Sequence, residues 1–288
     1  MERVKSVIGK ILGQPIREIT PLSGGDISSV YKVHYADSYI VVKVNKTPDG
    51  AAMFKAEMEG LQAIGRTNTI AVPEVIFLEL SEGMALLGMQ YIPEASPTDA
   101  FWQAFARDLG ALHDYTGQEF GWHGDNFIGN LPQINTPVDD WWEFYFENRI
   151  NIQLRMAIDS GRLGEKHRKT IEKIKREIHS LMPYPVPSLI HGDLWSGNFI
   201  CDTHQKPWLI DPAICYGDAA MDIAMSRLFG GFSPQFYQTY ADVRPATNTS
   251  DYATGLYQLY YLLVHVNLFG GGYGRSVDVL LKHLSKHL

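Results

Sequence analysis

The 288-residue sequence has two cysteines, Cys201 and Cys215, and no apolar run of membrane-spanning length. So few cysteines give no metal-binding spacing and suit a reducing compartment, so we expect a cytoplasmic protein. Basic residues number 25 against 32 acidic ones, and the resulting net charge of −7 argues against a general nucleic-acid binder. Residues 1–19 lack the basic-then-apolar order of a secretion signal. We therefore expect neither a nucleic-acid nor a membrane partner.

Two aspartates and an asparagine within residues 191–211 form the pattern that is most informative about function. Asp193 stands two positions after a histidine, Asn198 follows it by five residues, and Asp211 ends an apolar run. Phosphoryl transfer from ATP needs a group that accepts the proton of the attacking hydroxyl, and it needs oxygen ligands for Mg²⁺. We assign the first role to Asp193 and the second to Asn198 and Asp211. The spacing is that of the protein-kinase catalytic loop.

The first part of this pattern occurs twice, because residues 123–130 also read H-G-D-x-x-x-x-N. After the downstream copy, residues 199–201 and 208–211 predict a short hairpin that ends at a carboxylate. After the upstream copy, residues 131–137 have the composition of a loop, and no strand is expected to present a second acid there. The sequence therefore favours the downstream copy as catalytic and the upstream copy as a structured loop.

The order of predicted elements indicates an α+β protein with two lobes. The first ninety residues predict four strands, over 30–35, 39–44, 75–80 and 84–91, and one helix, over 51–64. The remainder is mainly helical, with Ser96 as an expected N-cap and helices over 97–114, 138–158, 165–181 and 252–268. We expect a small β-rich ATP-binding lobe of residues 1–92. A larger helical lobe, residues 93–288, should carry the catalytic loop and the acceptor site.

Lys43, in the strand predicted over residues 39–44, is expected to bind the phosphates of ATP. Lys43 interrupts an otherwise apolar strand, and a kinase needs such a cation at the α- and β-phosphates. The helix that follows offers Glu57 and Glu59 to hold it. At about 100° per residue, Glu57 falls on the apolar stripe of this helix, whereas Glu59 points to the far side. We therefore choose Glu57 as the partner of Lys43.

Two further segments are expected to contact ATP. One is the loop before the first clear strand, where backbone and hydroxyl groups can approach phosphate oxygens at Gly24, Gly25 and Ser28. The other is the end of the last strand of the small lobe, where backbone groups are expected to bind adenine at Met89, Gln90 and Tyr91.

The region after Asp211 is too short for a phosphorylation-controlled activation segment. Ten residues separate Asp211 from Asp222, and Gly192 stands where regulated protein kinases carry an arginine. These features predict a small-molecule kinase that needs no such switch. Asp222 is expected either to brace the backbone of the catalytic loop or to lie on a helix surface, and the sequence leaves both open.

Taken together, these residues resemble the fructosamine kinases, also called ketosamine-3-kinases, within the aminoglycoside-phosphotransferase-like kinases. The resemblance runs nearly end to end. Its motifs are Gly24-Gly25-Asp26-Ile27, Val72-Pro73, Asp125-Asn126-Phe127-Ile128-Gly129, the loop 191–198, Asp211-Pro212-Ala213 and Leu268-Phe269-Gly270-Gly271. The residues Trp195-Ser196-Gly197 between Asp193 and Asn198 of the catalytic loop are distinctive of this family. The Asp-x-x-x-x-Asn pattern itself is shared with all its relatives.

The resemblance implies transfer of the ATP γ-phosphate to the C3 hydroxyl of a ketosamine, with ATP and Mg²⁺ bound at Lys43, Glu57, Asp193, Asn198 and Asp211. A phosphate at C3 leaves more easily than hydroxide, so the product can eliminate and release its amine. This implies a repair role on glycated protein lysines or glycated amino acids. Some relatives carry a cysteine in the phosphate loop that permits disulfide control, and no cysteine is near that loop here.

The acceptor side is less well determined by the sequence. Asp125, Asn126 and Trp195 are candidate sugar contacts, although each could equally serve the core or cap a loop. The sugar, the amine carrier and the oligomeric state stay open, and a monomer is compatible with the sequence. A kinase of choline, an aminoglycoside or methylthioribose is the alternative enzyme. A pseudokinase that acts as a binding module is the alternative from another class.

Overall fold

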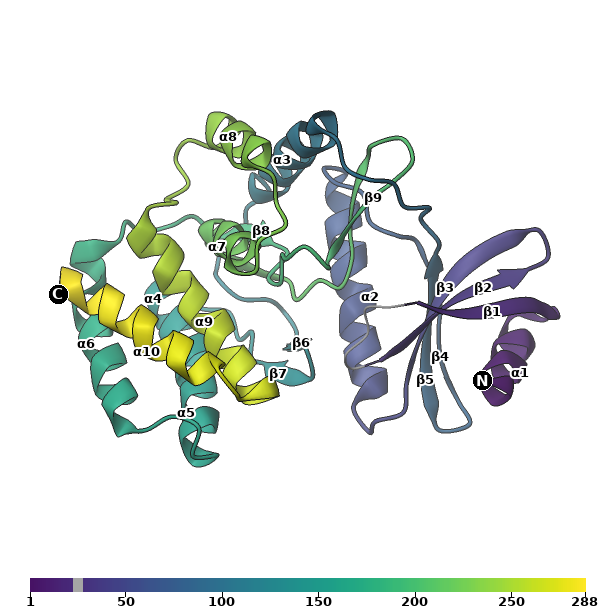
Figure 1. Ribbon diagram of the computed structural model, residues 1–288, viewed down its shortest axis with the longest axis horizontal. Coiled ribbons are helices and arrows are strands. Elements are labelled where there is room, and N and C mark those ends of the chain that lie inside the picture. Colours follow the sequence, from purple (N-terminus) through teal and green to yellow (C-terminus); the bar gives the residue numbers. More distant parts are fainter. Residues whose placement is uncertain (23–27) are drawn as a thin grey trace.

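The computed structural model describes residues 1–22 and 28–288, and it is α+β as predicted (Figure 1). The N-terminal part contains a five-stranded antiparallel sheet of order β1-β2-β3-β5-β4. Its elements are α1 (Glu2–Leu12), β1 (Ile16–Leu22), β2 (Ser29–Tyr35), β3 (Ser38–Asn45), α2 (Gly50–Thr67), β4 (Val75–Ser81) and β5 (Met84–Gln90). The four strands and the helix expected in this part are all present.

The sheet is covered by a helix on each face, and this sandwich positions Lys43. Successive side chains of a strand point to opposite faces. Val42 and Val44 of β3 are buried in the cluster that contains the apolar face of α1. The neighbouring side chains pack with α2, whose Phe54 and Leu61 lie against β5. Lys43 therefore leaves the sheet on the α2 side, which faces the rest of the molecule (Figure 1).

The remainder of the chain is mainly helical, and its described residues also form three short antiparallel strand pairs. Its helices are α3 (Asp99–His113), α4 (Trp141–Phe144), the π-helix η1 (Tyr145–Asn151), α5 (Ile152–Asp159), α6 (Glu165–Leu181), α7 (Ala220–Leu228), α8 (Pro234–Val243), α9 (Asp251–Phe269), α10 (Tyr273–Leu284) and the 3₁₀ turn η2 (Ser285–His287). Its strands are β6 (Asn126–Ile128), β7 (Leu131–Gln133), β8 (Ser188–Ile190), β9 (Phe199–Cys201), β10 (Pro207–Leu209) and β11 (Cys215–Gly217). We propose the lobe boundary at residues 92/93, in the segment between β5 and α3.

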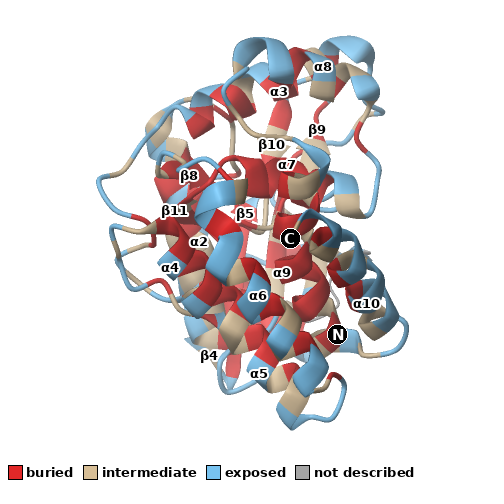
Figure 2. Ribbon diagram, turned by 90° about the vertical axis from the view of Figure 1, so that its left-hand side faces the viewer, coloured by how far each residue is buried: buried red, intermediate tan, exposed pale blue. Residues whose placement is uncertain are grey.

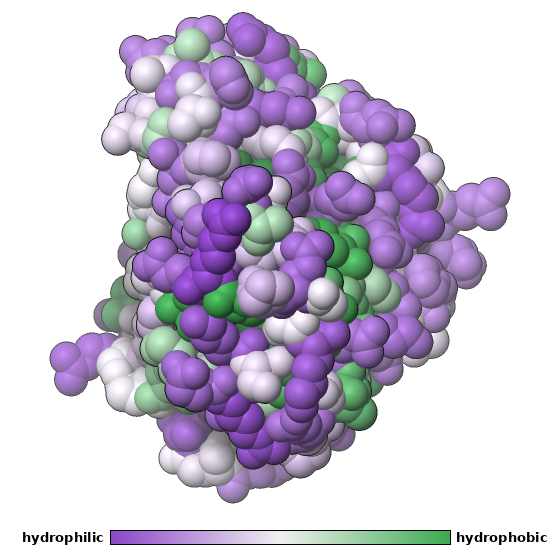
Figure 3. Space-filling model, turned by 90° about the vertical axis from the view of Figure 1, so that its right-hand side faces the viewer, coloured by the Kyte–Doolittle hydropathy of each residue, from purple (hydrophilic) through white to green (hydrophobic). Residues whose placement is uncertain are grey.

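The core of the helical part is built around α9. This helix is apolar on nearly all sides, a pattern that is typical of a buried helix, and most of its residues are buried (Figure 2). It packs with α7 and α10 in one cluster that includes Trp141, Tyr257 and Leu263. No helix among the described residues is both long and apolar enough to cross a membrane. The face on which the N-terminal part lies is mainly hydrophilic (Figure 3).

Two helix starts differ from the expectation for a common reason, which is capping. The helix expected to be capped by Ser96 begins at Asp99, because the Oγ1 of Thr98 accepts from the backbone N–H of Phe101. The helix expected from residue 138 begins at Trp141, because the carboxylate of Asp140 accepts from Glu143 N at 2.7 Å. Strand β1, which follows α1, was not predicted.

Candidate active site

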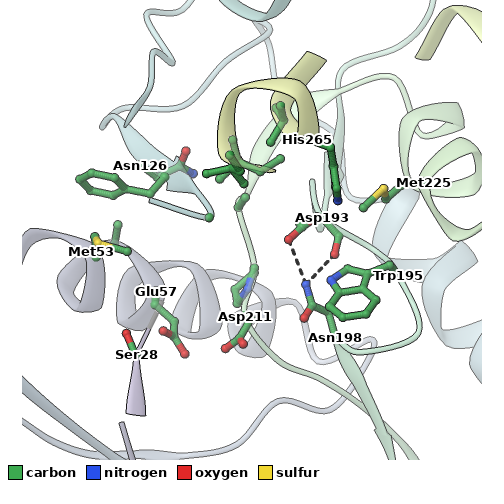
Figure 4. Close-up of a pocket in the computed structure, with 18 of the residues that line it drawn as sticks. Ser28, Met53, Glu57, Asn126, Asp193, Trp195, Asn198, Asp211, Met225 and His265 are labelled. Atoms are coloured by element: carbon green, nitrogen blue, oxygen red, sulfur yellow. Dashed lines mark hydrogen bonds between the residues drawn. The ribbon is translucent and has the colours of Figure 1, made fainter. Parts of the chain in front are cut away.

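Asp193 and Asn198 are joined by hydrogen bonds within the loop that connects β8 to β9. The amide nitrogen of Asn198 donates to the backbone oxygen of Asp193 at 2.8 Å and to its Oδ2 at 3.1 Å (Figure 4). An amide nitrogen carries two hydrogens, so both are used. The Oδ1 atom of Asn198 is thus the atom left to bind a cation.

Asp222 braces the backbone of this loop, so its alternative placement on a helix surface is wrong. The side chain is fully buried. Its carboxylate accepts from the backbone N–H of His191 at 2.7 Å and of Gly192 at 2.9 Å, and His113 lies 3.1 Å away. Burial opposes ionisation of Asp222, but these partners outweigh it and lower its pKa. A buried carboxylate on α7 therefore fixes the first two residues of the catalytic loop.

His191 links Asp193 to the strand that precedes Asp211. Its Nε2 lies 2.9 Å from the backbone oxygen of Ile210, and its Nδ1 lies 3.2 Å from the backbone nitrogen of Asp193. A carbonyl only accepts, so Nε2 carries the proton and Nδ1 accepts. Burial lowers the pKa of His191, which favours this neutral form. The imidazole thereby fixes the two aspartates relative to one another.

Gly192 occupies a position that no side chain fits. Its φ is +81°, and a Cβ atom would lie 2.1 Å from the backbone oxygen of Ala213. The carbonyl of Gly192 also accepts from the hydroxyl of Tyr261 at 3.0 Å. These contacts explain why the arginine of regulated kinases is replaced by glycine here.

Lys43 lies between two carboxylates from distant parts of the chain. Its Nζ is 2.7 Å from Oε1 of Glu57 and also forms an ion pair with Asp211. The lysine side chain is 11% exposed, so these contacts are largely shielded from water. Glu59, in contrast, faces solvent and lies 3.8 Å from Lys55. The pairing expected from the helical periodicity of α2 is therefore present.

One cation and two carboxylates determine the charge of this cluster. Burial opposes charge on Lys43, but Asp211 and Glu57 outweigh it and raise the lysine pKa. Lys43 likewise overcomes burial at Asp211 and lowers the pKa of that carboxyl. Burial, with the charge of Asp211 added, raises the pKa of Glu57 to about 8. Lys43 therefore favours the charged form of Asp211, and Glu57 takes up a proton more readily than an ordinary glutamate.

The oxygen donors near Asp193 fit a Mg²⁺ ion that is partly held by a substrate. Asn198 leaves one amide oxygen free, and Asp211 supplies a carboxylate that is 34% exposed. Mg²⁺ prefers such oxygens, and it is commonly bound by one or two protein ligands together with phosphates and water. Within residues 1–22 and 28–288 no group of three or more His, Cys, Asp or Glu side chains is arranged to hold a metal. The donor set therefore suits a metal–nucleotide complex.

Asp193 itself is poised to exchange a proton near neutral pH. Burial, followed by the negative charge of Asp211, raises its pKa to about 7. The hydrogen bond from Asn198 acts in the opposite direction but is weaker. The carboxyl is therefore protonated below this pH and ionised above it.

We expect this titration to be visible and to respond to a cation. In the nucleotide-free protein, ¹³C NMR of labelled aspartate should show one carboxyl, absent from Asp193→Asn, that titrates near pH 7. A cation at Asp211 offsets the charge that raises the pKa, so adding Mg²⁺ and ADP should lower it. A free-protein pKa of about 4, the ordinary aspartate value, or a rise on adding Mg²⁺ and ADP, would contradict this account.

A cavity of about 530 Å³ connects these groups with the helical part of the chain. Ser28, Lys43 and Glu57 line it from the N-terminal part, and Asp193 and Asn198 lie at its centre (Figure 4). Its far side consists of side chains from α7, α9 and the start of α10. These are Met225, Phe229, Val264, His265, Leu268, Phe269 and Tyr273.

Of the three candidate acceptor residues, Trp195 and Asn126 line the cavity. Trp195 is 38% exposed, and its ring lies over Gly197. Asn126 is buried, and its amide donates to the backbone oxygen of Ile214 at 2.8 Å and accepts from Gln133 at 2.7 Å. Because both ends of this amide are bonded to protein, Asn126 serves mainly to hold the neighbouring segment in place.

Asp125 does not line this cavity, so the structure adds no support to the expected contact with the acceptor. Its side chain is exposed, and its Oδ1 accepts from the backbone N–H of Asn135 at 2.8 Å. The segment after it also differs from the predicted loop, because β6 and β7 form a hairpin. Pro132 is tolerated in β7 because that strand pairs with β6 alone. The hairpin ends at Gln133 and presents no carboxylate, in contrast to the downstream copy.

Exchange of Asp125 for asparagine should accordingly have little effect on activity. The amide oxygen of asparagine can still accept from Asn135, so the loop should keep its shape. We expect the dissociation constant of Mg²⁺–ATP and the KM of the acceptor to change by less than about twofold. Steady-state kinetics and calorimetry measure both. Loss of metal-dependent nucleotide binding would show that the wrong copy was chosen.

Of the remaining described residues expected to contact ATP, one lines the cavity and three do not. Ser28 lines the cavity, where its hydroxyl accepts from Asn45 at 3.1 Å, whereas Gly24 and Gly25 lie outside the described residues. Met89, Gln90 and Tyr91 do not line this cavity. The backbone N–H of Gln90 donates to Glu74 at 2.8 Å, so it is not available to adenine. Adenine binding at this strand end stays a prediction for Met89, Gln90 and Tyr91, with the backbone N–H of Gln90 excluded as a donor.

Several cavity residues were not identified from the sequence as part of the site, among them Phe229, His265 and Tyr273. His265 could have been noticed, because it is the one titratable side chain other than tyrosine within the apolar run 252–268. Nothing comparable marks the other two, since aromatic residues in apolar helices usually belong to the core.

Comparisons with known proteins agree with this geometry. A family model described as fructosamine kinase matches residues 1–287. A Synechocystis protein named "Probable ketoamine kinase" is 37% identical over 284 residues, which cover 98% of this chain and 95% of the relative. The chloroplastic protein-ribulosamine 3-kinase of Arabidopsis thaliana is 35% identical over 267 residues, which cover 91% of this chain and 80% of the relative.

Solved structures show the same fold. One from Thermobifida fusca, described as a candidate fructosamine-3-kinase, has a TM-score of 0.88 at 30% identity and covers 99% of both chains. A thermostable mutant of aminoglycoside phosphotransferase APH(4)-Ia, in complex with ADP and hygromycin B, has a TM-score of 0.65 at 16% identity. The alignment covers 97% of this chain and 98% of that structure. At that identity the likeness concerns the fold alone, and it confirms the predicted kinase-like architecture.

Proposed function

The chain belongs to the fructosamine kinase family, and we propose that it transfers the γ-phosphate of ATP to the C3 hydroxyl of a ketosamine. The observation that carries this proposal is the cluster around Asp193. In one cavity it combines a carboxyl that can take up a proton, two oxygen ligands for a metal, and a buried lysine held by two acids. These are the parts that phosphoryl transfer requires.

Each residue has a distinct part in the proposed reaction. Asp193 orients the C3 hydroxyl and accepts its proton as the new oxygen–phosphorus bond forms and the bond to the departing ADP breaks. Asn198 and Asp211 would hold Mg²⁺, which offsets negative charge on the phosphates. Lys43, kept in place by Glu57, would bind the phosphates from the β-sheet side. Asp222 and His191 do not touch the substrate, but they position Asp193.

The product explains the proposed role in repair. A phosphate at C3 is a better leaving group than hydroxide, so the phosphorylated adduct can eliminate and release the amine to which the sugar was attached. We propose glycated lysines or glycated amino acids as the carriers, and the reducing cytoplasm as the compartment. Both cysteines are buried and unpaired, which suits that compartment.

Other readings are less well supported. A polycationic antibiotic acceptor would favour an acidic cluster in the C-terminal helices, but residues 252–288 contain one acid, Asp278, and it pairs with Lys166 at 2.8 Å. A choline or methylthioribose kinase would share the nucleotide side of the site but not the family. A pseudokinase is disfavoured because Lys43, Asp193, Asn198 and Asp211 are all in place.

An acceptor panel tests this proposal. Mg²⁺–ATP turnover would be measured with ribulosyl-lysine, fructosyl-lysine, choline, methylthioribose and an aminoglycoside at equal concentrations. We expect one or both ketosamines to give kcat/KM values at least about a hundredfold above the others, since the discrimination lies in acceptor contacts. Preference for choline, methylthioribose or the aminoglycoside would overturn the ketosamine assignment. ATP binding without turnover of any acceptor would instead favour the binding-module alternative.

A further inference from the structure

The wall of the cavity that faces away from Lys43 consists of a connected group of aromatic rings. We call Phe229, His265, Phe269 and Tyr273 the aromatic rim. The ring of His265 has its centre 4.7 Å from that of Phe229, 5.0 Å from Tyr273 and 5.5 Å from Phe269. All four line the same cavity as Asp193. In Figure 4, Asp193 lies between His265 and the Asp211–Glu57 side of the site.

His265 presents a hydrogen-bond acceptor within this rim. Its Nδ1 lies 2.8 Å from the backbone oxygen of Tyr261 on the same helix. Because a carbonyl only accepts, Nδ1 carries the proton, and Nε2 of the neutral ring has a free lone pair. Burial lowers the pKa of His265, which favours the neutral ring. The imidazole can therefore accept a hydrogen bond from an N–H or O–H group of a ligand.

The charges around the cavity are concentrated on the nucleotide side. Among the described lining residues the acids are Glu57, Asp193 and Asp211, and two of these pair with Lys43. The aromatic rim has no carboxylate. Ring faces attract a single cation, and they also pack with methylene groups. Such a wall fits one ammonium group attached to an aliphatic chain better than it fits a polycation.

The outer side of the rim is open to solvent, while its backbone is held firmly. Phe229 is 41% and Phe269 is 54% exposed. The last turn of α9, which carries Phe269, is fixed by Arg162, whose guanidinium donates to the backbone oxygens of Val266, at 2.8 Å, and Asn267. A cation at the C-terminal end of a helix is favourable for these carbonyl groups. The rim is thus a built surface with an exit for a long substituent.

We propose that the aromatic rim binds the amine side of the acceptor, that is, the secondary ammonium of a ketosamine and the first methylene groups of its carrier. This inference rests on the proposed function. The nitrogen of a ketosamine is attached at C1, two carbons from the reacting C3, so a sugar at Asp193 places its ammonium close by. Nε2 of His265 accepts from the ammonium, the rings of Phe229 and Phe269 flank the chain, and the carrier leaves between them. A lysine side chain on a protein surface can use the same exit.

A pair of acceptors that differ in one atom tests the proposal. One is 1-deoxy-1-propylamino-ribulose, and the other is 1-O-propyl-ribulose, in which an ether oxygen replaces the nitrogen. We expect the wild-type protein to prefer the amine by about tenfold or more in kcat/KM, the size expected for a partly desolvated cation at aromatic rings. Phe269→Leu, Phe229→Leu and His265→Leu should each reduce this preference severalfold through the KM of the amine. The KM of ATP should stay within about twofold, and the ether, which shares the propyl chain but lacks the ammonium, should lose less kcat/KM than the amine.

The controls separate failure of this inference from failure of the proposed function. Tyr115→Leu removes an aromatic ring that is 49% exposed but lies outside the cavity, and it should leave the preference unchanged. Phe229 and Phe269 are exposed enough that their leucine variants should fold, and an unchanged KM of ATP verifies this. Turnover of both acceptors with equal kcat/KM, or a preference that survives all three variants, would overturn the rim assignment alone. Turnover of neither acceptor by the wild type would overturn the ketosamine function and the rim assignment with it.

Discussion

Asp193→Asn is expected to lower kcat by about 10²- to 10⁴-fold while the affinity for Mg²⁺–ATP changes by less than about threefold. General-base catalysis typically contributes a factor of this size. The asparagine keeps the shape of the side chain, and its Oδ1 can still accept the 3.1 Å hydrogen bond from Asn198. The loss should therefore fall on the chemical step. Steady-state kinetics with a ketosamine acceptor, together with calorimetric titration of Mg²⁺–ATP, measures both quantities.

Asp125→Asn is the matched control for this experiment, because both aspartates stand in an identical H-G-D-x-x-x-x-N setting. The two exchanges replace the same type of side chain in the same sequence setting and differ in where the fold places it. Asp193 lines the cavity, whereas Asp125 is exposed and binds the backbone of Asn135. If Asp193→Asn retained more than about half of the wild-type turnover, Asp193 would not be the base.

Asp211→Asn should weaken Mg²⁺-dependent nucleotide binding by about tenfold or more. The exchange removes the carboxylate assigned to the metal, and a neutral amide oxygen is a weaker ligand for a hard dication. Lys43 would keep Glu57 as its partner at 2.7 Å, so the lysine should stay near its present place. Calorimetric titration of ATP in the presence of Mg²⁺ gives the affinity.

The same titration with a metal chelator provides the control for Asp211. Without Mg²⁺, the wild-type carboxylate repels the phosphates, so the variant should bind ATP as well as the wild type or better. A variant that lost affinity equally with and without metal would have a disturbed site rather than a missing ligand. Unchanged affinity in both conditions would remove Asp211 from the metal site.

The nucleotide side could be predicted because its signals are local. Because side chains alternate along a strand, Lys43 points to the face of the sheet away from Val42 and Val44. The 3.6-residue period of α2 selects Glu57 over Glu59. The hairpin β9–β10 follows from two short apolar runs around a polar turn, and it delivers Asp211. Each of these inferences needs only the geometry of one element and its neighbour.

The acceptor side depends on contacts between segments that are far apart in the sequence. Phe229 follows α7, His265 lies in α9 and Tyr273 begins α10. Tertiary packing brings these side chains together, and the periodicity of a single helix does not predict this. Asp125 lies outside the cavity, and its carboxylate accepts from the backbone N–H of Asn135, a contact that no local pattern indicates. Asp222 was left open between two roles because α7 is apolar on both sides, so burial of a carboxylate could not be distinguished from exposure.

The site of phosphorylation on the acceptor tests the central claim most directly. The protein would be incubated with Mg²⁺–ATP and ribulosyl-lysine, and the product examined by two-dimensional ¹H–³¹P NMR. We predict a single phosphate coupled to the proton on C3, followed by slow release of free lysine as the phosphate is eliminated. A phosphate on another hydroxyl, or ATP consumption without any phosphorylated ketosamine, would contradict the account.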